Sequence, residues 1–180
     1  MTNTIQSIQS EKNPTFIVIG YGNPHKGDEA IGTEVISQLS ALEIPNLEVH
    51  SVPQLTPELS GKLATPDYAV FVHACEFNNG NPVKLTALEA YGSESTGSGV
   101  PALGHSCDPC SLLALTKSVY GHCPKSWWVK VSARDFIPNR PLSTLARQSV
   151  AHALQVIEAL VCSVTKAVAH KKDTYQMLTE

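Results

Sequence analysis

The sequence predicts an α/β fold, a three-layer α/β/α sandwich with a mostly parallel central sheet. Short apolar runs alternate with amphipathic segments of helical period along the 180 residues, and this alternation is typical of parallel strands covered by helices on both faces. No internal repeat interrupts it, and a chain of this length can bury roughly two-thirds of its unfolded surface. We therefore expect one α/β domain at residues 14–162, a flexible lead at 1–13 and a helical extension or tail at 163–180.

The strands are predicted from short runs rich in Val, Ile, Phe and Tyr, which favour a buried, pleated backbone. The first of these runs ends in a Gly-Tyr-Gly-Asn-Pro segment that is suited to a tight turn. The fourth strand is expected at an edge of the sheet. In chain order the predicted strands cover residues 15–20, 47–52, 68–72, 83–88 and 127–131.

The helices are predicted from the spacing of apolar residues and from residues that favour helix starts. Ile31, Val35 and Leu39 recur every four residues and give the first helix an apolar face. Thr56 and Pro57 are suited to the N-cap and the first turn of a second, short helix. A segment rich in Gly and Ser, residues 92–104, predicts a loop before the third helix. The predicted helices cover residues 30–42, 56–63, 106–120 and 142–161.

Composition and charge exclude several classes of protein. The net charge is −3 and no basic stripe is present, so we expect no nucleic-acid partner. No apolar run approaches the roughly 18 residues of a membrane span, and residues 1–13 lack the apolar core of a signal peptide. We therefore expect a cytoplasmic monomer with no membrane partner. An odd set of cysteines then predicts reduced thiols, at Cys75, Cys107, Cys110, Cys123 and Cys162.

Three polar residues are predicted at ends of elements that such a fold gathers at one edge of the sheet. Glu29 follows the first strand, His73 follows the third, and His105 follows the Gly/Ser-rich loop. Ligands bind at this edge in open α/β sheets, and one carboxylate with two imidazoles suits nickel or zinc. Their proximity depends entirely on the fold. Asp28, beside Glu29, is expected to cap the start of the helix that follows.

Several blocks of the sequence resemble the [NiFe]-hydrogenase maturation endopeptidases, most closely the branch that serves bidirectional hydrogenases. The resemblance covers residues 15–159 and keeps the family's order of motifs. The blocks are Gly20-Tyr21-Gly22-Asn23 with Gly27-Asp28-Glu29-Ala30-Ile31-Gly32; Gln54-Leu55-Thr56-Pro57-Glu58-Leu59; Gly104-His105 with Pro109 and Leu112-Leu113; Leu115-Thr116-Lys117; and Tyr120-Gly121 with Trp127-Trp128-Val129.

The resemblance implies an endopeptidase that removes a C-terminal extension from the hydrogenase large-subunit precursor once nickel is loaded. The family senses this metal, which the substrate carries, with a Glu, an Asp and a His. Glu29 and His105 match the Glu and the His, whereas His73 stands where the family has the Asp. Glu29, His73 and His105 are therefore the predicted catalytic and metal-binding residues. The exchange removes one negative charge, supplies a nitrogen that nickel accepts, and makes binding proton-sensitive near a pKa of about 6.5.

The mechanism and the function class stay open at this level. No serine nucleophile motif is present, so water is the expected attacking group, and nickel could either polarise the scissile carbonyl or serve as a recognition handle. A non-proteolytic relative that binds the metallated subunit as a chaperone is the first alternative. A thiol redox protein is the second, because Cys107 and Cys110 form a C-x-P-C motif at a predicted helix start.

Two weaker interpretations rest on short motifs. His73, Cys75 and Glu76, together with Cys107 and Cys110, resemble a zinc-deaminase signature, but the Glu is displaced by one residue and a Pro is missing. A dinucleotide fingerprint at the first strand fails, because the third glycine position is a histidine and no acid ends the second strand.

Overall fold

A five-stranded mixed sheet forms the centre of the protein. The computed structural model describes residues 13–76, 81–90 and 107–177. The strand order is β2-β1-β3-β5-β4; every neighbouring pair is parallel except β4 and β5, which are antiparallel. The predicted edge strand is thus confirmed as β4. The strands are β1 (Phe16–Tyr21), β2 (Leu47–Val52), β3 (Tyr68–Glu76), β4 (Val83–Leu88) and β5 (Lys125–Ala133).

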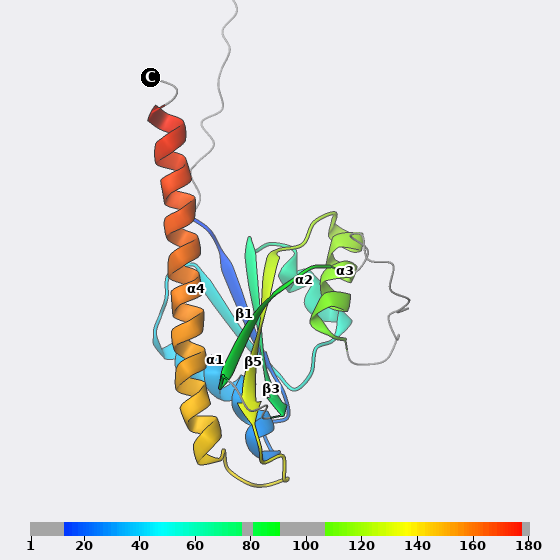
Figure 1. Ribbon diagram of the computed structural model, residues 1–180. Helices are drawn as coiled ribbons and strands as arrows, with labels where there is room; N and C mark the ends of the chain where they lie inside the picture. Colours follow the sequence, from blue (N-terminus) through cyan, green and yellow to red (C-terminus); the bar gives the residue numbers. More distant parts are fainter. Residues whose placement is uncertain (1–12, 77–80, 91–106, 178–180) are drawn as a thin grey trace, which may run out of the picture.

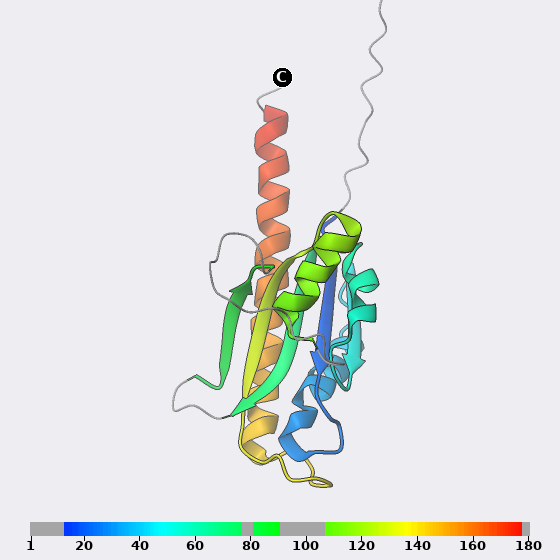
Figure 2. The same ribbon diagram turned by 90° about the vertical axis from the view of Figure 1, so that its right-hand side faces the viewer.

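Helices cover both faces of the sheet, which confirms the predicted sandwich. The helices α1 and α4 pack on one face, and α2 and α3 lie on the other (Figures 1 and 2). Two short 3-10 helices, η1 and η2, precede α1 and α2 in the chain. The helical elements are η1 (Gly27–Ala30), α1 (Ile31–Ala41), η2 (Pro57–Leu59), α2 (Ser60–Leu63), α3 (Pro109–Tyr120) and α4 (Thr144–Met177).

The alternation of side chains along each strand divides the core into two clusters. Val18 and Val70 point toward α1 and α4, whereas Ile17, Ile19 and Phe71 point toward α2 and α3, and all five are fully buried. This is the pattern expected for strands whose two faces are both covered. The same alternation continues to the carboxyl ends of the strands. It therefore determines on which face of the sheet the polar side chains at these ends lie.

Two motif glycines let α1 begin directly against the end of β1. A Cβ atom on Gly20 would lie 2.2 Å from the carbonyl oxygen of Gly32, and a Cβ on Gly32 would lie 2.6 Å from the backbone nitrogen of Tyr21. Contacts this short leave no room for any side chain. The glycines that define the first motif thus have a packing reason, since they bring η1 and α1 close to the carboxyl end of β1.

The boundaries of several predicted elements differ; β5, for example, covers Lys125–Ala133 rather than residues 127–131. The strand β3 does not stop at residue 72, because its pairing with β5 continues to the Glu76–Ala133 pair, so His73 lies inside β3 rather than after it. The second helix opens as the 3-10 turn η2, and the Thr56 side chain makes no capping hydrogen bond. The last helix continues without a break from Thr144 to Met177.

Helix α4 is long enough and apolar enough, over Thr144–His170, to pass a composition test for a membrane span. A core helix passes the same test, and α4 buries Ala146, Val150, Ala153 and Ile157 completely against the rest of the domain. Packing on the sheet accounts for this buried face, whereas 22% of the apolar window is buried. The C-terminal part of α4 extends past the amino-terminal edge of the sheet (Figure 1), at the end opposite to η1.

Candidate functional site

The candidate site lies at the carboxyl ends of β1 and β3, where η1 folds back over the sheet. Glu29 belongs to η1 and His73 to β3. Gly22 makes this fold-back possible: its φ is +141°, and a Cβ there would lie 2.2 Å from the carbonyl oxygen of Glu29. A side chain at position 22 would therefore push η1 away from the strand and move Glu29 with it.

Glu29 presents one oxygen that has no hydrogen bond. Its Oε2 atom is buried and accepts none from any described residue, while the side chain as a whole is 24% exposed. The charged group beside this oxygen is the Lys26 ammonium, with Nζ 2.9 Å from Oε2. Buried carboxylate oxygens normally have hydrogen-bond partners. The Lys26 ammonium is the cation with which this oxygen is already paired, and an anionic oxygen of this kind would also suit a divalent metal ion.

His73 is held flat against Tyr21. The two rings stack with centroids 4.5 Å apart and planes 4° from parallel, and Nδ1 of His73 lies 3.4 Å from the Tyr21 carbonyl oxygen. Because a carbonyl only accepts, this contact favours a proton on Nδ1 and leaves the lone pair of Nε2 unused.

The surroundings of His73 lower its pKa below the ordinary value. Burial is the largest cause and Lys130 acts in the same direction, whereas the Tyr21 carbonyl and the Glu29 carboxylate oppose them. The imidazole is therefore neutral at pH 7, which is the form that ligates a metal or accepts a proton.

The structure brings two of the three predicted site residues toward each other. The Glu29 carboxylate acts electrostatically on His73, which fits the packing of η1 on β3. His105 and the predicted loop at residues 92–104 lie outside the described residues. Among the residues that are described, no group of three His, Cys, Asp or Glu side chains could hold a metal ion. The complete three-residue set thus stays a prediction.

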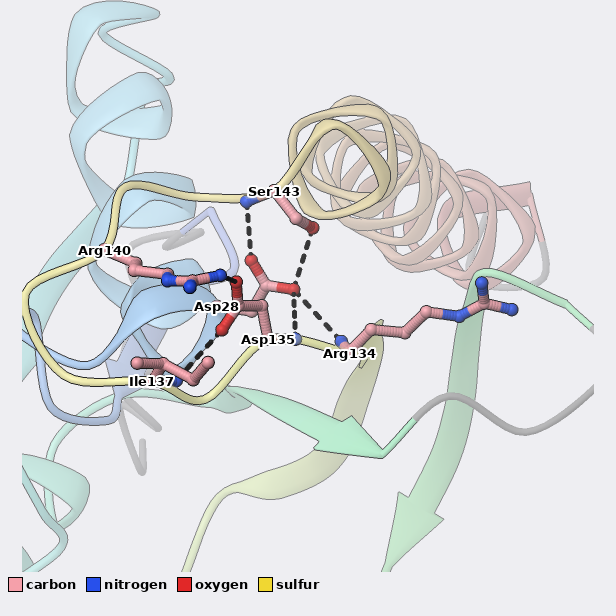
Figure 3. A network of polar contacts seen from close by, with 6 residues as sticks. All are labelled: Asp28, Arg134, Asp135, Ile137, Arg140 and Ser143. Atoms are coloured by element: carbon pink, nitrogen blue, oxygen red, sulfur yellow. Dashed lines mark hydrogen bonds and ion pairs between the residues drawn. The ribbon is translucent and has the colours of Figure 1, made fainter.

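Asp28 does not cap the helix that follows it, so that prediction is wrong. Its fully buried carboxylate instead accepts hydrogen bonds from the backbone nitrogens of Arg134, Asp135 and Ser143, at 3.0, 3.0 and 2.7 Å, and from the Ser143 hydroxyl at 2.8 Å (Figure 3). Burial alone would raise the pKa of Asp28, but these hydrogen bonds outweigh it and lower the pKa. Asp28 therefore fixes η1 to the β5–α4 connection.

Sequence reasoning missed a row of side chains across three strands of this edge. Tyr21, His73 and Lys130 lie on adjacent strands and on the same face, since His73 pairs with Lys130 and Tyr21 follows the Gly20–Val72 pair. Lys130 Nζ is 3.9 Å from the centre of the Trp128 ring. The period-two alternation of β5 could have shown on which face Lys130 lies. Placing it beside His73 would also have required the strand pairing.

The two cysteines of the C-x-P-C motif lack the environment of an attacking thiolate. All five cysteines are free. Asp108 caps α3 by accepting hydrogen bonds from the backbone nitrogens of Cys110 and Ser111. Burial and the Asp108 carboxylate raise the pKa of both Cys107 and Cys110. Reactive cysteines have a lowered pKa, so the helix start does not activate these thiols.

Solved structures of hydrogenase maturation proteases share this fold. The hydrogenase maturating endopeptidase HybD from E. coli aligns with a TM-score of 0.64 and 21% identity, over 83% of this chain and 93% of that one. The [NiFe] hydrogenase maturation protease HycI from Thermococcus kodakarensis aligns with a TM-score of 0.60 and 20% identity, over 84% and 94%.

A third maturation protease extends the comparison. The hydrogenase 2 maturation peptidase from a Thaumarchaeota archaeon aligns with a TM-score of 0.57 and 21% identity, over 81% of this chain and 97% of that one. No protein-family model and no curated protein matches the sequence. The chain is thus an α/β/α sandwich with the fold of the hydrogenase maturation proteases.

Proposed function

We propose that this protein is a hydrogenase maturation endopeptidase that removes the C-terminal extension of a nickel-loaded [NiFe]-hydrogenase large-subunit precursor. The observation that carries the proposal is the position of Glu29 and His73. They lie at the carboxyl edge of a sheet whose fold is that of solved maturation proteases, and one Glu29 oxygen there is buried without a hydrogen bond.

In this proposal, nickel arrives as part of the substrate. Glu29 offers an anionic oxygen to it and His73 offers Nε2, both of which are donors that nickel accepts. Because His73 is neutral at pH 7, it can do so without first losing a proton. The family aspartate could also act as a base toward the attacking water. A neutral imidazole with its proton on Nδ1 has one free lone pair, on Nε2, so His73 can serve as a nickel ligand or as a base but not as both at once. We propose the ligand role, and on that basis we expect cleavage to survive the exchange of Asp for His.

The test is cleavage of purified precursor in the presence and absence of bound nickel. We expect a mobility shift of the large subunit, with a released peptide detected by mass spectrometry, only for the nickel-loaded form. The Glu29→Gln variant should cleave at least about a hundredfold more slowly, because it loses the anionic ligand while keeping its shape. If the natural protein is inactive and His73→Asp restores cleavage, our interpretation of His73 is wrong.

The same assay distinguishes the chaperone alternative. A non-proteolytic relative would bind the nickel-loaded large subunit and elute with it from a sizing column, and the C-terminal extension would remain intact. The thiol redox alternative has less support, because the pKa of both Cys107 and Cys110 is raised. Rapid reduction of a model disulfide would nevertheless favour it over a peptidase.

A further inference from the structure

The turn that precedes η1 anchors the backbone of Lys26 near Glu29. The backbone nitrogen of Lys26 donates to the Asn23 carbonyl at 3.2 Å, and the Lys26 carbonyl accepts from the Glu29 backbone nitrogen at 3.0 Å. The neighbouring His25 carbonyl accepts from the backbone nitrogen of Asn139 at 2.8 Å. The stem of Lys26 therefore starts from a backbone that is anchored on both sides of the turn.

Lys26 and Glu29 form an ion pair at Oε2, the Glu29 oxygen that is buried without a hydrogen bond. Nζ lies 2.9 Å from Oε2, and the Lys26 side chain is 43% exposed against 24% for Glu29. Lys26 is thus the more exposed member of the pair. A metal ion that uses Oε2 must displace this ammonium or bind directly beside it.

We propose that Lys26 is a specificity residue that prevents Glu29 from binding free divalent metal ions. The proposal rests on the function proposed above, in which the metal reaches Glu29 as part of a protein substrate. A bare ion must break the ion pair and then lies next to a positive charge, with nothing to offset the loss. A metal ion held in a docked protein arrives with the contacts of the whole interface, which offset it.

The size of the effect follows from the charges. The repulsion energy between a unit positive charge and a divalent ion about 5 Å apart is large enough, even at the dielectric constant of water, to weaken binding about tenfold. Removing the Lys26 charge should therefore tighten the binding of free nickel to Glu29 by about that factor. Arginine at position 26 keeps the charge and should leave the affinity unchanged.

The experiment is a calorimetric titration of the full chain with Ni²⁺ alone, at pH 7 and without any hydrogenase subunit. We expect Lys26→Met to bind Ni²⁺ about tenfold more tightly than the natural protein, and Lys26→Arg to match the natural protein. The same removal of charge from an exposed lysine of α2, Lys62→Met, is the matched control and should change nothing. Adding Glu29→Gln to Lys26→Met should abolish the gain.

Three results would overturn the proposal. They are equal affinities of the natural protein and Lys26→Met, a gain that persists when Glu29 is replaced, and an equal gain in Lys62→Met. Lys26→Gln provides a second neutral variant should Lys26→Met fold poorly, as judged by its thermal unfolding. The titration uses no precursor, so it tests the role of Lys26 independently of the cleavage assay. A failed cleavage assay would contradict the proposed function and would leave the result of the titration unchanged.

Discussion

Replacing Asp28 by asparagine tests whether a buried carboxylate fixes the element that carries Glu29. The change keeps the shape of the side chain and removes its charge. In the folded protein, Oδ2 accepts from the backbone nitrogens of Arg134 and Asp135 and from the Ser143 hydroxyl, and Oδ1 accepts from the Ser143 backbone nitrogen. An asparagine has a single acceptor oxygen, so in either orientation its amide N–H₂ faces a backbone donor.

The cost of Asp28→Asn can be worked from these contacts. A hydrogen bond to a charged group contributes about 1.5–3 kcal/mol, and a buried donor left without an acceptor costs about 1–3 kcal/mol. At least one backbone N–H is orphaned and the others lose a charged partner, so we expect a loss of about 3 kcal/mol in the free energy of unfolding. For a domain of this size, that corresponds to a fall in Tm of about 6–12 °C.

The pH dependence of unfolding gives the same prediction a second readout. The pKa of Asp28 is lowered in the folded state, so its stabilising contribution is complete above the ordinary carboxyl pKa of about 4 and is lost as the pH falls through the folded-state pKa. The difference in urea midpoint between the natural protein and Asp28→Asn should therefore be large at pH 7 and shrink below about pH 4.

An exposed carboxylate provides the control. Asp67 accepts hydrogen bonds from the backbone nitrogen and the hydroxyl of Thr15, both at 2.8 Å, but it is exposed. Asp67→Asn should cost less than about 1 kcal/mol, because water can replace the lost interactions. Equal urea midpoints for Asp28→Asn and the natural protein at pH 7, or a difference that does not change down to pH 3, would refute the reasoning.

Two further predictions concern the site. In NMR titrations the imidazole of His73 should titrate below pH 6.5; Glu29→Gln should lower its pKa further and Lys130→Met should raise it, because the Glu29 and Lys130 charges act on the ring in opposite directions. A shift of the same sign in both variants would contradict this account. The double variant Cys107→Ser, Cys110→Ser should keep full cleavage activity. In the natural protein, the thiols of Cys107 and Cys110 should react slowly with iodoacetamide at pH 7, because burial raises their pKa. Loss of cleavage would give these thiols a role.

The sheet and its helices could be predicted because periodicity and local signals agree along most of the chain. The β-branched run of β1 and the four-residue spacing of Ile31, Val35 and Leu39 each point to one structure. The end of β3 could not be predicted this way. The strand continues through His73 and Cys75 because β5 supplies partners for both, and strand pairing is a property of the fold rather than of the local sequence.

The same distinction explains what was missed at the site. Glu29 follows a motif at the first strand and could be singled out from sequence, whereas the role of its neighbour Asp28 depends on residues more than 100 positions away. An acid near a helix start is most often a cap, and local reasoning therefore gave the wrong role. The part played by Lys26 was hidden for another reason, since its three-residue separation from Glu29 becomes informative only once η1 is known to be a 3-10 turn.

The proposed function, in which the metal is bound within a substrate protein, can be set against the charges at this edge of the sheet. Burial keeps His73 neutral at pH 7, so among the described residues Glu29 is the one predicted ligand that carries a negative charge. Lys26 lies against it at 2.9 Å, and Lys130 acts on His73 from the neighbouring strand. With the Lys26 ammonium against Glu29 and the Lys130 ammonium acting on His73, this edge attracts a bare divalent cation poorly. In the proposed function, a metal centre within a folded substrate protein would bring its own anionic ligands to this edge.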